Sequence, residues 1–229
     1  MNASARSRPS APDSTEVNTS DMEIVHRMFR REVVVLGRAV SRVPEGDTTG
    51  ARPVASHATL ILDFLVNHHA GEDELLWPLL RARSNEGREL VDLMEVQHRE
   101  IHGILTDLRA RLQLWEGTAH QQDRDVLVRL LGQLREILHA HLDAEERLLL
   151  PLARMVLTSM EWGALGRHGA AGTPRRPLLA LMLLGAILED ADAAEREDFL
   201  ANVPRPARLA WSTIGRRRYA AYAAGLRLT

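Results

Sequence analysis

Two histidines of the chain each precede a glutamate by about one turn of helix. His68 is followed by Glu72, and His141 by Glu145, both four residues later. In a helix such residues share one face and lie about 6 Å apart along the axis. Each pair therefore offers an imidazole nitrogen and a carboxylate oxygen in the same direction. Because the chain has no cysteine, thiolate zinc sites and iron–sulfur clusters are excluded, and any metal must be held by nitrogen and oxygen.

The two pairs belong to an internal repeat. His68 and His141 occupy equivalent positions, and in both copies a proline, Pro78 or Pro151, follows the glutamate by six residues. A repeat of this kind predicts two copies of one helical hairpin, facing each other across a pseudo-twofold axis. The imidazole and the carboxylate of each copy then project into a shared interior.

Three more histidines extend the candidate set. His26 precedes His68 by nearly the same number of positions as His98 precedes His141, which carries the repeat into the segments before the two pairs. His98 and His102 are four residues apart, so they put two imidazoles on one face of another helix. Histidines and carboxylates that project inward from four helices are the ligand set of a dinuclear metal site in a bundle core.

Counting ligands predicts an asymmetric pair of metal ions. In such sites the ions lie about 3.5–4 Å apart, close enough to share bridging carboxylates and one oxo or hydroxo group. The bridging residues are Glu72 and Glu145; one ion takes His98, His102 and His141, and the other takes His26 and His68. The first ion then has six ligands and the second has five, which leaves one position open. Imidazole and carboxylate ligands favour two iron ions, with manganese less favoured.

Other polar residues near the motifs are interpreted as structural or solvated. His69 points about 100° away from His68, so it is predicted to lie outside the ligand set or at the surface. Asp73 and Glu146 are taken as solvated acids, with a role as alternate ligands left open. His57 lies about 16 Å along the axis from His68, too far for the same ion, and is predicted to be a hydrogen-bonded core residue. Structural or solvated roles are also predicted for His120, His139, His168, Trp77, Trp115 and Arg216–Arg218.

The segments that carry these residues have the pattern of long amphipathic helices. Apolar residues recur every three or four positions, which predicts helices over about 21–41, 51–83, 85–116 and 120–160. With short loops, they predict an all-α, up-down-up-down four-helix bundle. Residues 1–19 are predicted to be a disordered leader, 20–158 the bundle with its metal site, and 159–229 a C-terminal helical appendage. Its shorter helices are expected near 160–168, 177–190, 193–201 and 206–225.

Composition narrows the class of protein. The net charge of −2 argues against a nucleic-acid partner. All 29 basic residues are arginines, which excludes Schiff-base and P-loop lysine chemistry. The first 20 residues lack the apolar core of a signal peptide, and the longest apolar run, Leu178–Leu188, is shorter than the about 20 residues that span a bilayer. We therefore expect no membrane partner and a cytoplasmic location.

Taken together, the motifs resemble the hemerythrin-like family, the HHE cation-binding domains. The matching elements are His26, His68 with Glu72 and Pro78, His98 with His102, and His141 with Glu145 and Pro151, over about residues 20–155. The resemblance implies a non-heme di-iron centre in a four-helix bundle that handles O2 or peroxide. The family's oxygen carriers have an aspartate five residues after the histidine that corresponds to His141. Here that position is Glu146, whereas the internal repeat favours Glu145, so both remain candidates for the bridge.

Three functions agree with these features. The first is binding of O2 or peroxide at the open iron position. The alternatives are a di-iron oxidase, oxygenase or catalase-like peroxidase acting on a small substrate, and a sensor of O2 or iron that signals through the C-terminal region. A carrier needs only the bundle, so the appendage over 159–229 discriminates among them. Expected partners are O2 or peroxide, a small-molecule substrate in the enzymatic case, and a second copy of the chain bound through the C-terminal region.

Overall fold

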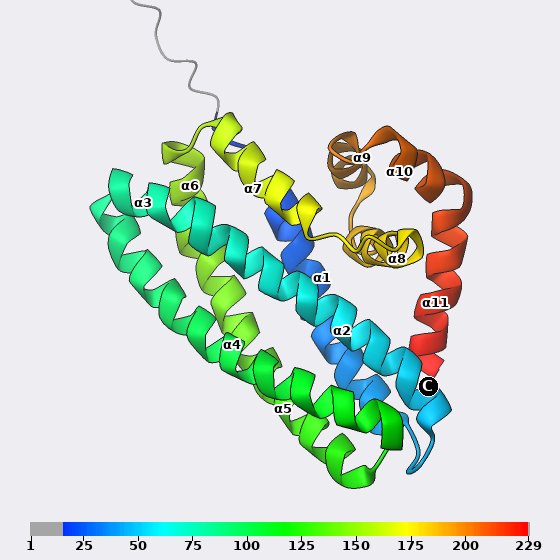
Figure 1. Cartoon of the computed structure of the whole chain (residues 1–229). Coiled ribbons are helices and arrows are strands. Elements are labelled where there is room, and N and C mark those ends of the chain that lie inside the picture. Colours follow the sequence, from blue (N-terminus) through cyan, green and yellow to red (C-terminus); the bar gives the residue numbers. More distant parts are fainter. Residues whose placement is uncertain (1–15, 229) are drawn as a thin grey trace, which may run out of the picture.

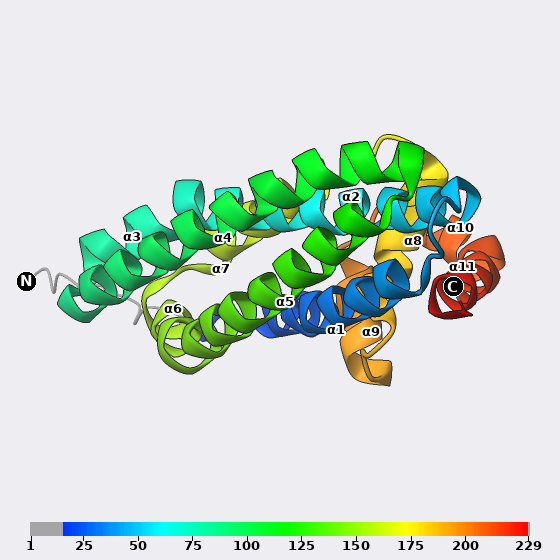
Figure 2. The same ribbon diagram turned by 90° about the horizontal axis from the view of Figure 1, so that it is seen from below.

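The computed structural model describes residues 16–228, and every regular element in that range is helical (Figure 1). Four long helices form the bundle: α1 (Ser20–Arg42), α2 (Thr48–Gly71), α4 (Asn85–Thr118) and α5 (Gln121–Ala144). Figure 2 shows α2 and α4 in one layer and α1 and α5 in the other. The predicted all-α four-helix bundle is thereby confirmed.

The apolar seam of α4 explains why this helix packs into a bundle. Its buried side chains alternate at spacings of three and four residues: Val91, Met94, His98, Ile101, Leu105, Leu108 and Leu112. This spacing keeps one narrow stripe facing the neighbouring helices along the whole length of α4. Because His98 occupies one position of the stripe, the pattern that packs α4 also delivers an imidazole to the interior.

The helices after the two His–Glu motifs change their winding at the glutamates. Along the chain, α2 continues through the π-helical segment η1 (Glu72–Leu76) into α3 (Trp77–Arg83), and α5 continues through η2 (Glu145–Leu149) into α6 (Leu150–Val156). The segments predicted as single helices are therefore continuous, but each contains one widened turn. Turns of this kind are frequent at functional sites.

The proline of each motif accounts for the widened turn. In η1 the amide of Trp77 donates to the carbonyl of Glu72, five residues back, and in η2 the amide of Leu150 donates to Glu145. The next residue in both segments is a proline. A proline has no N–H, and its ring crowds the carbonyl four residues earlier, so a regular α-helical ladder is interrupted there.

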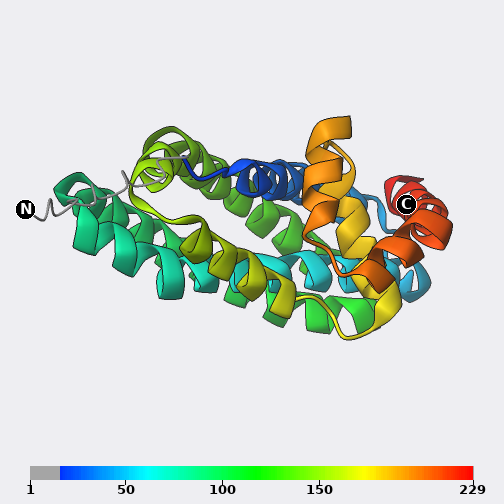
Figure 3. The same ribbon diagram turned by 90° about the horizontal axis from the view of Figure 1, so that it is seen from above.

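The C-terminal region consists of shorter helices packed on α1 and α2. They are α7 (Ser159–Ala171), α8 (Pro177–Leu188), α9 (Ala193–Ala201), α10 (Arg205–Ala210), η3 (Trp211–Gly215) and α11 (Arg216–Leu228). Figure 3 shows α7 along α2, with α8–α11 gathered toward the opposite end of the bundle from α3 and α6. Residues 181–188 of the apolar helix α8 are buried, as its composition requires.

The helix boundary that differs most from the sequence prediction is the end of the fourth long segment. The fourth long segment was expected to reach residue 160, but α6 ends at Val156 and α7 begins at Ser159. Thr158 and Glu161 form a capping box, in which each side chain bonds the other residue's backbone amide. Such a box satisfies free amides at a helix start, so the chain begins a new helix here instead of extending the old one.

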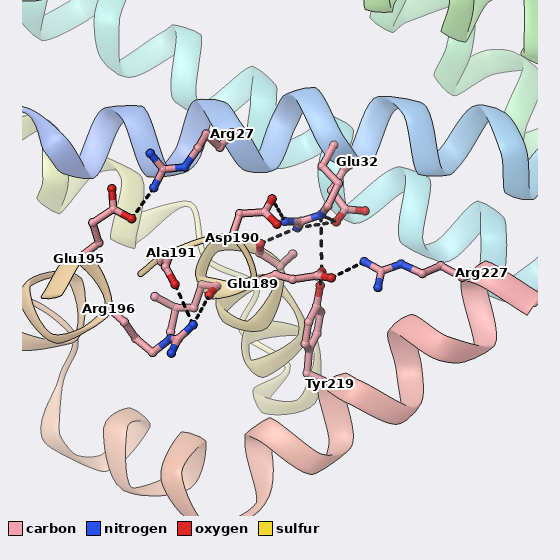
Figure 4. Close-up of polar contacts among 12 residues, drawn as sticks. Arg27, Glu32, Glu189, Asp190, Ala191, Glu195, Arg196, Tyr219 and Arg227 are labelled. Carbon is pink, nitrogen blue, oxygen red and sulfur yellow. Dashed lines mark hydrogen bonds and ion pairs between the residues drawn. The ribbon is translucent and has the colours of Figure 1, made fainter. Parts of the chain in front are cut away.

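The appendage is attached to α1 by ion pairs (Figure 4). Arg27 lies 2.6 Å from the carboxylate of Glu195 at the start of α9. Arg31 contacts Asp190 and lies 3.5 Å from the carboxylate of Glu189, both just after α8. These arginines come from the same helix as His26, so α1 joins the C-terminal helices to the region of the metal motifs.

The N-terminal end of the described chain packs on the bundle. Val17 and Thr19 are buried, and Arg154 donates to the Thr19 hydroxyl at 2.7 Å. Residues 1–15 of the predicted leader lie outside the described residues. Among the described helices, none combines the length and hydropathy that crossing a membrane requires.

Candidate metal centre

Six of the seven predicted ligands meet in the bundle interior, and one further histidine joins them. The cluster draws on six elements: His26 (α1), His68 and His69 (α2), Glu72 (η1), His98 (α4), His141 (α5) and Glu145 (η2). Four of these side chains, His26, Glu72, His141 and Glu145, are fully buried. Both hairpins of the repeat contribute to the set, as the pseudo-twofold arrangement requires.

The imidazoles converge in two pairs. The Nε2 atoms of His26 and His68 lie 3.3 Å apart, and those of His98 and His141 also lie 3.3 Å apart. Two imidazole nitrogens that point toward one small space can bind the same ion. The pairs are those that ligand counting assigned to the two different ions.

Each glutamate contacts one imidazole from each pair. The two oxygens of Glu72 diverge, Oε1 lying 3.0 Å from His68 Nε2 and Oε2 lying 3.4 Å from His98 Nε2. Glu145 Oε2 lies 3.4 Å from His26 Nε2 and 3.8 Å from His141 Nε2. A carboxylate placed between two sets of nitrogen ligands is suited to bridge two cations.

The glutamate oxygens also need positive partners. Both oxygens of Glu72 and both of Glu145 are buried and make no well-formed hydrogen bond. Burial of carboxylates without such bonds costs several kcal/mol per ion. Metal cations held among these oxygens and the imidazoles would remove that cost, so the donor set fits a metal site of nitrogen and oxygen ligands.

The pKa values within the cluster diverge because its ionisable groups are buried and interact with one another's charges. Burial would raise the pKa of Glu72, but the neighbouring His68 and His98 bring it well below its usual range. Burial and then the negative charge of Glu72 raise the pKa of Glu145 well above its usual range. Burial and the charge of His98 lower the pKa of His141 to about 3, which favours the neutral imidazole that a metal requires.

A second acid in each π-helical segment holds a histidine of the opposite hairpin. Asp73 Oδ1 lies 2.9 Å from His98 Nδ1, and Glu146 Oε1 lies 2.9 Å from His26 Nδ1. Burial opposes the charge of His98, but its hydrogen bond to Asp73 and the nearby buried glutamate raise its pKa to about 9. Burial would raise the pKa of Glu146, whereas His26 and Arg30 lower it to about 2. Both acids thus orient an imidazole through the ring nitrogen that faces away from the cluster.

This arrangement distinguishes the two candidate bridging residues. Glu145 lies inside the cluster, whereas Glu146 lies behind His26 and accepts from Arg30 at 2.7 Å. Asp73 occupies the equivalent place in the other hairpin. Glu146, five residues after His141, therefore faces away from the cluster.

His102 is the one predicted ligand that the structure leaves outside the cluster. Its side chain is exposed, because Ile101 takes the buried position of the α4 seam after His98. A ligand at four residues from His98 would require a different rotation of α4, which the apolar seam prevents. His102 instead lines a surface cavity of about 530 Å³ that also reaches His69 and His98.

His69, predicted to lie outside the ligand set or at the surface, lies inside the cluster. Its side chain is 6% exposed, and its ring stacks on that of His98 with centroids 4.0 Å apart. It offers a nitrogen within 4.8 Å of ligand atoms of Glu72, His98 and His141. His69 faces His98 of α4 and His141 of α5, whereas the half-buried His68, which diverges from it by about 100°, lies on the side of α2 that α7 covers. Five of the six residues at 60–65 are apolar and all five are buried, and this wide apolar face shortly before His69 is the sequence signal of burial on more than one side of α2.

Away from the cluster, His57 has the structural role that the sequence predicted. Its Nε2 lies 2.8 Å from Glu32 Oε2, and its Nδ1 lies 2.9 Å from the hydroxyl of Tyr222 in α11. Glu32 was not identified from the sequence. Burial would raise its pKa, but the hydrogen bond from His57 and the charge of Arg31 lower it. Trp77 and Trp115, also predicted to be core residues, are almost fully buried.

Histidines and carboxylates converging from a four-helix bundle define this chain as a metal-binding helical protein. A family model described as "Hemerythrin HHE cation binding domain" matches residues 18–153, more than half of the chain, and the chain belongs to this hemerythrin family. Comparisons with curated proteins and with solved structures each give no significant match. The family match ends before α7, so the C-terminal helices lie beyond it.

Proposed function

We propose that the chain binds two iron ions in this cluster and that the centre binds O2 or peroxide. The observation that carries the proposal is the placement of Glu72 and Glu145, each of which contacts one imidazole of both pairs. A single ion would need only one such set. Imidazole and carboxylate donors suit iron among the redox metals.

The proposed ligand set differs from the sequence prediction at one position. Glu72 and Glu145 would lie between the two ions; His26 and His68 would hold one, and His69, His98 and His141 would hold the other. The ion on the His26 side then has one ligand fewer. Two such iron ions supply reversible O2 binding, or reduction of O2 or peroxide where protons and a reductant are available. The protein's own residues orient the imidazoles and surround the site with apolar side chains.

The experiment that tests the function follows the absorption spectrum of the iron-loaded protein. The protein is reduced without air, exposed to O2, and then returned to an O2-free atmosphere. Spectral changes that reverse over several cycles support O2 binding. Irreversible oxidation would show that O2 is consumed and would favour an oxidase or peroxidase. No spectral response to O2 or peroxide would refute the proposal.

The ligand set is tested by metal analysis of two matched variants. His69→Ala removes a buried imidazole of the cluster, and His102→Ala removes an exposed one that is one helical turn from His98. We expect His69→Ala to lower the iron content toward one ion per chain and His102→Ala to leave it at two. The reverse result would restore the ligand set predicted from spacing alone.

An oxidase or oxygenase is the second candidate function. It is favoured by a cavity of about 100 Å³ that reaches His68 and is lined by Val25, Phe64 and Trp162. A carrier requires access only for O2, whereas this cavity adjoins a much larger one in the C-terminal region.

A further inference from the structure

The C-terminal helices line a large, partly open apolar cavity beside the bundle. It has a volume of about 490 Å³ and lies among α2, α7, α8, α9 and α10. Most of its wall is aliphatic or aromatic, including Leu184, Ile187, Val203 and Pro206. Cavities of this size and character are typical of sites for small organic ligands.

A smaller cavity adjoins this space and reaches His68 of the metal cluster. The cavity of about 100 Å³ that reaches His68 shares three wall residues with the larger one: Phe64 of α2, Gly169 of α7 and Phe199 of α9. The two cavities therefore lie on either side of the same short boundary. Through them, the C-terminal helices border the side of the cluster that has one proposed ligand fewer.

The ionisable side chains of the two cavities line the smaller one, whereas the polar residues of the larger one, Thr173 and Asn202, are neutral. Asp21, Asn67 and His168 line the smaller cavity but not the wall of the larger one. His168 Nε2 is buried and has no hydrogen-bond partner among the described residues, so it is available to a ligand. The larger cavity is thus lined mainly by apolar side chains, and the ionisable groups lie beside His68.

The opposite approach to the cluster has a different chemistry. The cavity at His69 and His98 is bordered by Asp73, Arg99 and His102, which suits water, protons and small polar reactants. The cluster consequently has a polar approach on one side and an apolar one on the other. Two reactants of different polarity are able to reach it separately.

We propose that the two adjoining cavities bind an apolar organic molecule with one polar end, its chain among α8, α9 and α10 and its polar end beside His68 and His168. A role of this molecule as a substrate would rest on the proposed di-iron centre acting as an oxidase or oxygenase, the second candidate function, whereas its binding requires only the cavities. A medium-length linear alcohol has the matching chemistry, because it combines an extended hydrocarbon with a single hydrogen-bonding hydroxyl group.

The test uses the full-length protein and calorimetric titration with 1-decanol. Gly169 lines both cavities, and a Cβ added there meets no atom within 4 Å, so Gly169→Phe places a ring at the boundary without a backbone clash. Gly163 lies on the same helix but lines neither cavity, and its added Cβ meets only Arg167 at 3.4 Å. Gly163→Phe is therefore the matched control.

We expect one molecule of 1-decanol per chain to bind the wild type and Gly163→Phe, with affinity at least tenfold weaker in Gly169→Phe. Ala207→Phe, which narrows the larger cavity from α10, is expected to weaken binding similarly and gives a second test if Gly169→Phe does not fold. Absence of binding to the wild type, or equal binding to all folded variants, would overturn the inference. A dimer of the wild type that Gly169→Phe dissociates, without any binding of decanol, would assign the cavity to a second copy and would also overturn it.

Iron content measured on the same samples separates this inference from the proposed function. Decanol binding without bound iron would support the cavity assignment while removing the di-iron proposal. Two bound iron ions without decanol binding would leave the metal centre standing and remove the cavity assignment. Because Gly169 contributes no proposed ligand, its substitution is expected to leave the iron content unchanged.

Discussion

The acids behind the two histidine pairs provide a test of the whole arrangement. Asp73 acts on His98, and Glu146 acts on His26, both at 2.9 Å through Nδ1. The proposed ligand set puts these histidines on different ions. Replacing either acid with alanine should therefore weaken the binding of one ion and leave the binding of the other unchanged.

The size of each effect follows from the surroundings of the acid. Loss of a carboxylate that orients a ligating histidine typically costs about 10- to 100-fold in metal affinity, or about 1.4–2.7 kcal/mol. The side chain of Asp73 is 47% exposed, so solvent screens it and we expect about tenfold. The side chain of Glu146 is 27% exposed and also neutralises Arg30, which is left near His26 with Asp143 when Glu146 is removed. We therefore expect about 100-fold for Glu146→Ala.

The assay is competition for ferrous iron with a coloured chelator under anaerobic conditions, which resolves two dissociation constants. Glu74→Ala is the control, because Glu74 is an exposed acid in the same turn as Asp73. Asp73→Ala should add nothing in a His98→Ala background, since Asp73 acts on the metal only through that ring. Two results would refute this arrangement: fully additive effects of Asp73→Ala and His98→Ala on affinity, or weaker binding of the same ion in the Asp73 and Glu146 variants.

Three further predictions concern the attachment of the appendage to the bundle. Glu32→Ala leaves His57 and Arg31 without their buried partner and should destabilise the protein by about 3–5 kcal/mol. The expected fall in Tm is about 6–20 °C. An unchanged Tm would contradict a stabilising role for the Glu32 contacts. Because the pKa of Glu32 is lowered, its charge stabilises the fold above the usual value of 4.5, and this stabilisation is lost as the pH falls through the folded-state value. Glu32→Gln should therefore make the free energy of unfolding depend less on pH in that range. Urea titration at several pH values measures this. Gly185→Ala puts a Cβ into the space of the Tyr219 ring. It should destabilise the protein by about 1–3 kcal/mol by separating α8 from α11, while the iron content stays unchanged. A denaturation curve identical to that of the wild type would show that the Tyr219 ring moves aside without cost and would contradict the prediction.

The sequence was a sufficient guide to the bundle because its signals are local or repeated. The spacing of apolar residues predicted the four long segments, and the nearly constant offset between matching residues of the two halves predicted two equivalent hairpins. The position of Pro78 and Pro151 repeats within them, and both prolines follow a widened turn that no periodicity indicated. That turn forms because a missing amide and a bulky ring interrupt the hydrogen-bond ladder.

The selection between neighbouring side chains depended on packing between helices. Residues one position apart diverge by about 100°, so a modest rotation of a helix exchanges which of them faces inward. The apolar seam of α4 turns His98 inward and His102 outward. Packing of α2 against α4 and α5 keeps His69 buried, with its ring against those of His98 and His141. Neither rotation is encoded in the spacing of the histidines themselves.

The sequence by itself determined the donor types, the absence of thiolate ligands, the repeated His–Glu motifs and the helices that carry them. Only the tertiary structure decided that Glu145 enters the cluster while Glu146 supports His26, and that the C-terminal helices line an apolar cavity that adjoins a smaller one reaching His68. The physical reason is that donor chemistry and helix periodicity are properties of short segments. The rotation of each helix and the space between helices result from burial of many apolar side chains at once.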